Sequence, residues 1–323
     1  MTLEPSVITH RSRSEDMTAI RLVIIVPTYG NWTDCMECLE LLSRQNEPGF
    51  HVILADDGAP TSAPTRVSEL PFVTHLRLAH RGFAATCNAA AELAISKGAT
   101  HLLLLNDDTT FGDSFIGTWL RKIQETPDAI LGPIIYYHDR PQEVWFSGGA
   151  GSILVPFVRF RRQPEGQMPV DILTGCALVV PVSAWKDVGG FDESYVTYYE
   201  DFDLLLRARS KGIPAYLVVE PELAVQHKVA RTAGRDGPWP REYRLLSSRL
   251  RFIRKTYTGW SKGTCLALAG AQLLFNLVLH LPAIPSLSRL WQAIVDGFQS
   301  SQRDTSDRGR RISVRSHPPG VSQ

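Results

Sequence analysis

The stretch of sequence that decides the fold is residues 102–109, which read Leu-Leu-Leu-Leu-Asn-Asp-Asp-Thr. Four consecutive leucines leave no polar face, which is typical of a strand buried on both sides of a parallel sheet. The run ends at Asp107 and Asp108, and ligand sites in such sheets lie just beyond the carboxyl ends of the strands. Hard oxygen ligands at that position favour Mg²⁺ or Mn²⁺. The alternative is a polar turn leading into the next helix, since Asn and Asp are common turn residues.

Short apolar runs alternate with segments of helical period on both sides of this strand. Strands are expected at 22–26, 51–55, 73–78 and 101–105, and helices at 83–96 and 114–125. This alternation predicts an α/β fold, a doubly wound and mostly parallel sheet with helices on both faces. Shorter apolar pieces broken by glycines over 130–181 predict a mixed or antiparallel extension of that sheet. A helix over 200–210 and strands over 214–219 and 223–226 follow, and further helices are expected at the C-terminal end.

Length, charge and cysteine content narrow the class of protein. A chain of 323 residues can hold one large α/β domain plus an appendage. Lys and Arg (34) nearly balance Asp and Glu (33), so no overall charge favours nucleic acid as a partner. The five cysteines are an odd number and the first nineteen residues have no apolar signal stretch, which predicts a cytoplasmic setting. Cys35 and Cys38 have no second ligand pair, so they are interpreted as helix residues and not zinc ligands.

The chain is predicted to divide into four regions. Residues 1–20 and 300–323 are polar tails expected to be disordered, 21–230 form the main domain, and 231–299 form a helical segment. Within 239–260, basic and aromatic residues alternate, which suggests a surface lying against anionic lipid.

A membrane span is considered for residues 264–281, where His280 is the only acid or base. However, Gln272, Asn276 and His280 fall four apart and form a polar stripe, which favours a helix lying in an interface or packed against protein. Residues 287–298 form an amphipathic face with apolar positions Leu287, Leu290, Trp291, Ile294, Val295 and Phe298. Two interpretations stay open for the segment: contact with the inner leaflet as a peripheral membrane protein, or a helical cap on the main domain.

Four motifs have to be considered together. Pro27-Thr28-Tyr29 ends the first strand, where an aromatic ring and backbone groups could receive a flat base. Asp56-Asp57-Gly58 ends the second strand, where a carboxylate can accept the imide N–H of a pyrimidine. Asn106-Asp107-Asp108 is the third motif, and all three lie on one rim of the sheet. The fourth is residues 189–193, Gly-Gly-Phe-Asp-Glu, followed at 198–203 by Tyr-Tyr-Glu-Asp-Phe-Asp.

In combination these motifs resemble glycosyltransferase family 2. That family has the GT-A fold and transfers sugar from a nucleotide diphosphate with inversion, and this sequence looks most like its bacterial rhamnosyltransferases of O-antigen and cell-wall assembly. The likeness runs from about Arg21 to His227 and implies that 21–230 are a nucleotide-sugar transferase domain. It implies a single-addition hexosyltransferase of polysaccharide synthesis, because the Gln-x-x-Arg-Trp signature of processive members is absent.

The resemblance also implies roles for individual residues. The nucleotide-binding positions are Pro27, Thr28, Tyr29, Asp56 and Asp107, with Asp56 holding the base, Tyr29 stacking on it and Asp107 contacting the ribose. Thr174-Gly175 corresponds to the loop beside the diphosphate and acceptor, and Asp201 to the general base. Asp108 matches the metal-binding end of the D-x-D motif, and His227 matches a further metal ligand. The implied cofactor is Mg²⁺ or Mn²⁺, the donor a UDP or dTDP sugar, and the acceptor a glycan or a polyprenyl-linked molecule.

The sequence departs from the family pattern in three places. Asn106 occupies the first D-x-D position, His80-Arg81-Gly82-Phe83 replaces the usual Asn-x-Gly-Phe, and the spacing after His227 differs.

The chemistry supports the assigned roles. A divalent ion can neutralise the charge of a leaving diphosphate, and a positioned carboxylate can take the proton of an acceptor hydroxyl. Glu200 and Asp201 have an alternative reading as acidic residues that simply begin a helix.

Two other functions are alternatives to sugar transfer. A sugar-phosphate nucleotidyltransferase would need a glycine-rich phosphate loop after the first strand, and Gly30-Asn31-Trp32 does not provide one. A catalytically silent, membrane-associated scaffold of the same fold would not need to retain both Asp108 and Asp201.

Overall fold

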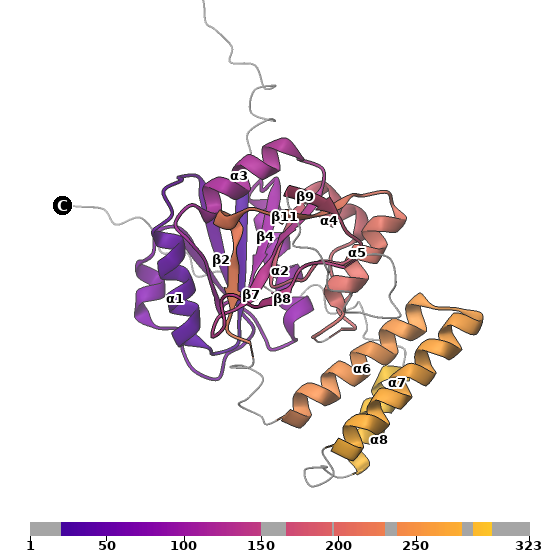
Figure 1. Ribbon diagram of the computed structural model, residues 1–323. Coiled ribbons are helices and arrows are strands. Elements are labelled where there is room, and N and C mark those ends of the chain that lie inside the picture. The colour runs from indigo at the N-terminus through magenta and orange to yellow at the C-terminus, as the bar shows by residue number, and fades with distance from the viewer. Residues whose placement is uncertain (1–20, 150–165, 196, 230–237, 280–286, 299–323) are drawn as a thin grey trace, which may run out of the picture.

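The computed structural model describes residues 21–149, 166–195, 197–229, 238–279 and 287–298. In these residues an α/β domain is followed by three helices that lie together at one side of it, next to the end where α5 is seen (Figure 1). The tails predicted at 1–20 and 300–323 lie outside the described residues.

The main sheet of the described residues has eight strands in the order β3-β2-β1-β4-β10-β6-β11-β9. Their bounds are β1 Leu22–Thr28, β2 Phe50–Asp56, β3 Val73–Arg77, β4 His101–Leu105, β6 Ile130–Pro133, β9 Gly166–Pro169, β10 Ala177–Pro181 and β11 Ala215–Val219. Strands β1 to β4 run parallel, whereas β10 is antiparallel to both β4 and β6. All five residues of β4 are buried, so the prediction of a strand covered on both faces is confirmed.

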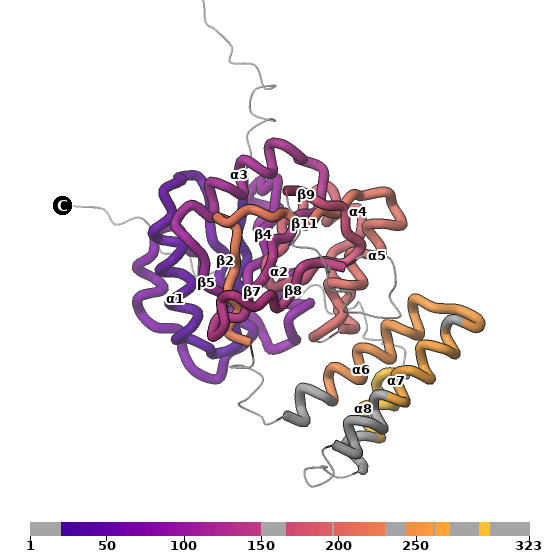
Figure 2. The backbone as a smooth tube through the Cα atoms, viewed as in Figure 1, coloured from indigo at the N-terminus to yellow at the C-terminus, as the bar shows by residue number. Residues whose placement is uncertain are grey.

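A second sheet of the described residues has the order β5-β12-β7-β8. It contains β5 Thr109–Thr110, β7 Ile135–Tyr137, β8 Val144–Phe146 and β12 Val225–His227. The mixed extension expected over 130–181 is therefore divided between the two sheets. Strands β9 and β10 join the main sheet, whereas β7 pairs with β12 and β8 pairs with β7. In this second sheet β12 pairs antiparallel with β5 and parallel with β7; the segments β5, β7 and β8 are labelled on the backbone in Figure 2.

Helices cover both faces of the main sheet, as predicted. They are α1 Trp32–Ser43, α2 Phe83–Ser96, α3 Phe115–Glu125, α4 Val182–Val188 and α5 Glu200–Ser210. Alternate residues of β1 face opposite layers, because successive strand side chains point to opposite faces. Ile25 joins a core with alanines of α2, whereas Ile24 joins a core with Leu39 of α1 and Trp119 of α3. Cys35 and Cys38 are buried, free thiols within α1, which agrees with their interpretation as helix residues.

The C-terminal helices are α6 Pro238–Thr256, α7 Gly259–Leu279 and α8 Leu287–Phe298. Leu250 and Ile253 of α6 pack with Cys265 and Ala269 of α7 in a small core of their own. No helix within the described residues is long and apolar enough to cross a membrane, so the span considered for 264–281 is not found there. The side chains of Gln272 and Asn276, and residue His280, lie outside the described parts.

The apolar face predicted over 287–298 is only partly covered. Ile294 packs against the small helical core, but Trp291 is 67% exposed. The physical reason is that α8 approaches α6 through small residues: a Cβ added at Gly297 would lie 2.8 Å from Cβ of Leu250. Ala293, one helical turn before Gly297, is fully buried, whereas Trp291 is exposed.

Candidate active site

The carboxyl ends of β1, β2 and β4 meet on one rim of the main sheet. Thr28 at the end of β1 is in register with Asp56 at the end of β2. The Thr28 hydroxyl also donates a 2.7 Å hydrogen bond to Oδ2 of Asp107, which follows β4. The structure therefore brings together three motifs that lie far apart in the chain, as the strand-end positions predicted.

Asp56 is fully buried and its carboxylate is already engaged. Oδ1 accepts a hydrogen bond from the Ala59 N–H at 2.7 Å, and Oδ2 accepts one from Nη1 of Arg77 at 3.1 Å, with Nε2 of His75 3.3 Å away. Burial alone would raise the pKa of Asp56, but these partners outweigh it and lower the pKa. Asp56 is thus an ionised acceptor whose Oδ2 must be shared by any incoming N–H. Sequence reasoning missed Arg77, because only the β2–β3 register places it opposite Asp56.

Tyr29 forms an aromatic pair that the sequence did not predict. Its ring is 45% exposed and stacks on His80, with ring centroids 4.4 Å apart and an interplanar angle of 27°. His80 is held by Asp57, whose Oδ2 lies 2.8 Å from Nδ1 of the imidazole. Asp57 also accepts hydrogen bonds from the backbone N–H of Gly82 and the hydroxyl of Thr86 at the start of α2. The Asp57 carboxylate thereby links the rim, the His80 ring and the first turn of that helix.

Asp107 points into the protein and has an unusual pKa. Burial, with a further contribution from the charge of Asp108, raises the pKa of Asp107 to about 8, against the hydrogen bond from Thr28. Its Oδ2 is occupied by that hydroxyl. A contact between Asp107 and a ribose stays a prediction, and Oδ2 could take part only by sharing its bond with Thr28.

Asp108 and His227 are brought together as a pair. Nε2 of His227 lies 3.1 Å from Oδ1 of Asp108, because His227 of β12 pairs with Thr109 of β5 in the second sheet. Oδ1 of Asp108 is buried and accepts no hydrogen bond of good geometry, which is a donor set that suits a divalent cation. Within the described residues there is no cluster of three or more His, Cys, Asp or Glu side chains suited to a metal ion. The metal role of Asp108 and His227 therefore stays a prediction, in which substrate phosphates and water would have to complete the coordination.

Lys228, directly after His227, was not expected from the sequence. Its ammonium lies 2.8 Å from Oδ1 of Asp34 and 2.5 Å from Oε2 of Glu37, both on α1. Burial lowers the pKa of Lys228, but hydrogen bonds and charges from the two carboxylates outweigh it and the pKa is raised. Its backbone N–H donates to the carbonyl of Asp108 at 3.0 Å. Lys228 therefore ties the Asp108–His227 pair to α1.

Asp201 lies in the first turn of α5 and contacts the 174–175 loop, so the structure brings these two predicted site segments together. Its Oδ2 accepts a 2.9 Å hydrogen bond from the Gly175 N–H, and its Oδ1 accepts one from the Phe202 N–H at 2.8 Å. Burial raises the pKa of Asp201, whereas these bonds and one from Thr174 oppose the rise. Glu200 is also buried, its Oε2 has no partner, and burial together with the charge of Asp201 raises its pKa well above the usual value.

The loop of residues 174–176 connects Asp201, the candidate base, with the turn that carries Asp108, the candidate metal ligand. Gly175 donates to Asp201, and the carbonyl of the next residue, Cys176, accepts a 2.9 Å hydrogen bond from the Asn106 N–H. Asp201 and the Asn106–Asp108 turn are therefore held on two sides of one short loop. This arrangement makes a single site from segments separated by about ninety residues of sequence.

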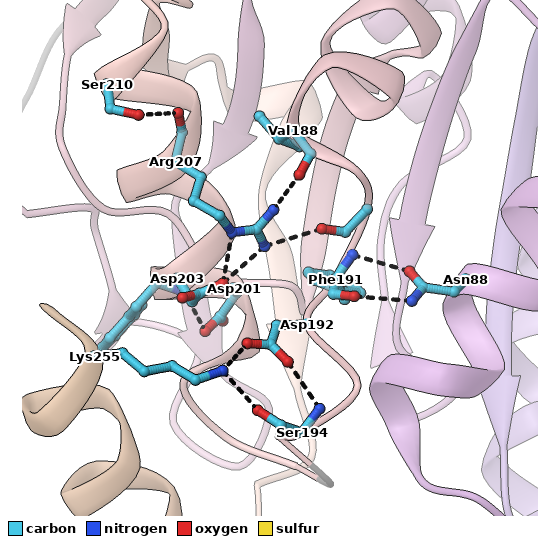
Figure 3. Close-up of polar contacts among 12 residues, drawn as sticks. Asn88, Val188, Phe191, Asp192, Ser194, Asp201, Asp203, Arg207, Ser210 and Lys255 are labelled. Atoms are coloured by element: carbon cyan, nitrogen blue, oxygen red, sulfur yellow. Dashed lines mark hydrogen bonds and ion pairs between the residues drawn. The ribbon is translucent and has the colours of Figure 1, made fainter. Parts of the chain in front are cut away.

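The Gly-Gly-Phe-Asp-Glu motif has a supporting role in the structure. Arg207 of α5 donates to Oδ2 of Asp203 and to the carbonyls of Val188 and Gly190, at 2.7, 2.5 and 2.9 Å (Figure 3). Asn88 of α2 brackets Phe191, accepting from its N–H and donating to its carbonyl, both at 2.9 Å. These contacts hold in place residues 188–191, which lie before Asp201 in the chain.

Comparison with known proteins identifies a family and related folds. Residues 23–188 match the sequence model of "Glycosyl transferase family 2". The chain is 29% identical, over 266 residues, to an N-acetylglucosaminyl-diphospho-decaprenol L-rhamnosyltransferase of Mycobacterium tuberculosis, and the match covers 74% of this chain and 86% of that protein. The family match stops at residue 188, before both Asp201 and the C-terminal helices.

Two solved structures share the fold. One is a mannosyltransferase from Pyrobaculum calidifontis in complex with GDP-Man and Mn²⁺, with a TM-score of 0.53, 15% identity, and coverage of 87% of this chain and 86% of that one. The other is residues 1–349 of S. aureus TarS in complex with UDP, with a TM-score of 0.54, 18% identity, and coverage of 86% and 80%. The predicted GT-A-type α/β fold is thereby confirmed.

Proposed function

The chain belongs to glycosyl transferase family 2 and is a glycosyltransferase, and on that basis we propose that it is an inverting, metal-dependent enzyme that adds one sugar to a lipid-linked acceptor. The observation that carries the proposal is the arrangement of Asp201 and the Asp108–His227 pair on two sides of the 174–176 loop. This arrangement fits a reaction in which one group activates an acceptor and another holds a diphosphate.

The donor binds along the rim formed by β1, β2 and β4. The exposed ring of Tyr29, backed by His80, offers a stacking surface for the base. The base imide N–H is received by Oδ2 of Asp56, which is ionised and held by Arg77. Backbone groups of Pro27 and Thr28 flank this position, and Asp107 lies on the ribose side. A UDP or dTDP sugar satisfies both recognition elements.

The diphosphate binds beside Asp108 and His227, which would hold Mg²⁺ or Mn²⁺. Such an ion would neutralise the negative charge that develops on the leaving diphosphate. The orphaned Oδ1 of Asp108 and the adjacent imidazole nitrogen support this assignment. The mannosyltransferase of the same fold contains Mn²⁺ with its nucleotide sugar.

Asp201 takes the proton of the acceptor hydroxyl. A general base on the face opposite the leaving group gives inversion, and such a base contributes roughly 10²–10⁴-fold to rate. The raised pKa of Asp201 makes it a stronger base than an exposed aspartate. Its two N–H partners and Thr174 fix the orientation of the carboxylate.

The acceptor is proposed to be a polyprenyl-linked glycan, and rhamnose is the first donor sugar to test. Support comes from the 29% identical mycobacterial relative, whose name gives a decaprenol-linked acceptor and an L-rhamnosyl donor group. A lipid-linked acceptor requires the enzyme to work at a membrane surface. We assign this contact to the cytoplasmic face and to α6–α8, where Trp260 is 96% exposed and Trp291 is 67% exposed.

The test is transfer from dTDP-rhamnose and UDP sugars to a short polyprenyl diphosphate N-acetylglucosamine, with Mn²⁺, Mg²⁺ or chelator. Asp201→Asn is expected to lower the rate by roughly 10²–10⁴-fold with donor affinity retained, because it removes only proton acceptance. Asp108→Ala is expected to remove the metal dependence of nucleotide binding. The matched control is Asp139→Asn, which changes an exposed carboxylate that pairs with Arg140. Wild-type turnover in Asp201→Asn would refute the assignment, and nucleotide-sugar binding without transfer to any acceptor would favour a silent scaffold.

A further inference from the structure

The chain adopts a strained turn immediately before the proposed general base. Tyr198 and Tyr199 have φ angles of 67° and 70°, and they are the only described residues other than glycine with positive φ. Side chains larger than glycine's disfavour this region, so two such residues in succession persist only where the surrounding structure holds them. Tyr199 is also the residue from which α5 starts, since its carbonyl accepts a 2.9 Å hydrogen bond from the Asp203 N–H.

One face of α6 holds this turn. The ring of Phe252, which is 2% exposed, packs against the ring of Tyr199 with centroids 5.2 Å apart. One helical turn earlier, the hydroxyl of Ser248 donates a 2.8 Å hydrogen bond to the carbonyl of Thr197. Residues four apart lie on the same side of a helix, so both contacts come from one face.

The same face of α6 also holds the chain before the turn. The ammonium of Lys255 is paired with Asp192 and lies 2.9 Å from the hydroxyl of Ser194 (Figure 3). It also lies 5.3 Å from the ring centroid of the fully buried Tyr195. Contacts from α6 therefore hold both the strained turn itself, through Tyr199, and the chain that leads into it, from Asp192 to Thr197.

We propose that α6 is a positioning element of the active site, in which Phe252 and Ser248 hold the Tyr198–Tyr199 turn and thereby aim the Asp201 carboxylate at the acceptor. The inference rests on the proposed role of Asp201 as general base. If the turn relaxed, the first turn of α5 would shift, and Asp201 would lose its alignment with the N–H group of Gly175. Because the family match ends at residue 188, this device lies in the part of the chain that the family model does not cover.

Phe252 acts through Tyr199 and is a positioning residue. If α6 had only a structural role, its substitutions would have different effects from those expected of a positioning element. In that case, any loss of buried apolar contact from α6 would lower stability and activity together. Ile253 provides the matched comparison, because it is also buried on α6 but packs against Cys265 and Ala269 of α7, away from the turn. The two adjacent residues therefore separate the face of α6 that contacts the Tyr198–Tyr199 turn from the face that contacts α7.

The experiment compares Phe252→Ala, Phe252→Leu, Ser248→Ala and Ile253→Ala in the full-length enzyme. Rates of transfer at saturating donor and acceptor, the nucleotide dissociation constant and the thermal midpoint are measured for each. Phe252→Ala is expected to lower kcat at least tenfold with nucleotide affinity within twofold, Phe252→Leu to recover most of the rate, and Ser248→Ala to show a smaller loss. Ile253→Ala is expected to lower the thermal midpoint as much but keep kcat within about twofold.

The pH profile gives a readout that a structural role would not move. Loss of the Gly175 N–H bond to Asp201 removes a partner that lowers the pKa of its carboxyl, so the acidic limb of kcat/KM should shift to higher pH in Phe252→Ala. If Phe252→Ala does not fold, Ser248→Ala carries the same test, because it removes one hydrogen bond and little volume. Equal kcat values for the Phe252 and Ile253 variants, or an unmoved acidic limb, would overturn the inference while leaving Asp201 as the base. Retention of the wild-type rate in Asp201→Asn would instead remove the proposed base, and this inference with it.

Discussion

Replacing Lys228 by methionine tests the link between the candidate metal pair and the rest of the fold. Methionine keeps the unbranched apolar stem but removes the ammonium that pairs with Asp34 and Glu37. Lys228 and Asp34 are 4% and 3% exposed at their side chains, so this pair is sheltered from water. Glu37 is 46% exposed and contributes little, because exposed ion pairs are screened.

The expected loss of stability follows from the removal of one partner of the buried Lys228–Asp34 ion pair. Asp34 would keep the 3.0 Å hydrogen bond from the Asn31 amide but would lose the ammonium of Lys228, which lies 2.8 Å from its Oδ1. Removing one partner of a buried ion pair costs about 3–5 kcal/mol. A loss of that size corresponds to a drop in thermal midpoint of roughly 6–20 °C, at about 2–4 °C for each kcal/mol. The raised pKa of Lys228 means that the contribution is complete below the usual lysine pKa and is lost only as pH rises above it, so neutral pH is suitable.

The assay is urea unfolding followed by circular dichroism, with Lys122→Met as the control. Lys122 makes comparable contacts with Glu125 and Glu220, but these are at the surface, and about 0–1 kcal/mol is expected. Asp34→Asn and the double variant complete a mutant cycle, which should be strongly non-additive. A Lys228→Met loss within 1 kcal/mol of the control, or an additive cycle, would refute the reasoning.

Further predictions concern the acid–base groups, the donor and the membrane. Burial raises the pKa of Asp201 above its ordinary 3.8, and the base acts only when deprotonated. In a pH–rate series, kcat/KM should therefore fall with decreasing pH, with a midpoint above pH 3.8. A midpoint at or below pH 3.8 would contradict this prediction. Glu200 keeps a proton in the folded protein that the unfolded chain releases. The free energy of unfolding should therefore decrease as pH rises from the ordinary carboxyl pKa toward the raised pKa, and this decrease should be less steep in Glu200→Gln. Equal slopes for the two proteins in urea unfolding would argue against the prediction. Tyr29→Ala should cost about 1–3 kcal/mol of stacking, roughly a 5- to 150-fold weaker nucleotide dissociation constant by calorimetry. Trp260→Ser should reduce co-sedimentation with anionic vesicles, and wild-type protein that stays in the supernatant at low salt would remove the membrane assignment.

Local periodicity was sufficient for several elements of the α/β domain and for the rim, although the strand predicted at 223–226 lies at Val225–His227. The predicted helices at 83–96 and 200–210 and the strand at 101–105 have the same bounds as α2, α5 and β4. Each is defined by side chains near in sequence, which is why a pattern of residues can predict it. Parallel pairing then places the strand ends together, so Thr28, Asp56 and Asp107 could be grouped in advance.

The remaining features of the site depend on contacts between distant segments. Arg77 meets Asp56 through the β2–β3 register, His227 meets Asp108 through the β5–β12 pairing, and Lys228 reaches α1 across 194 residues of sequence. The contact of Phe252 with the strained Tyr199 turn is of the same kind. None of these has a sequence period, because strand register and helix docking are set by how buried surfaces fit together in three dimensions. The sequence by itself thus determined the α/β sheet and the residue types at its rim, and only the tertiary structure decided which charges face each other and which helix supports the proposed base.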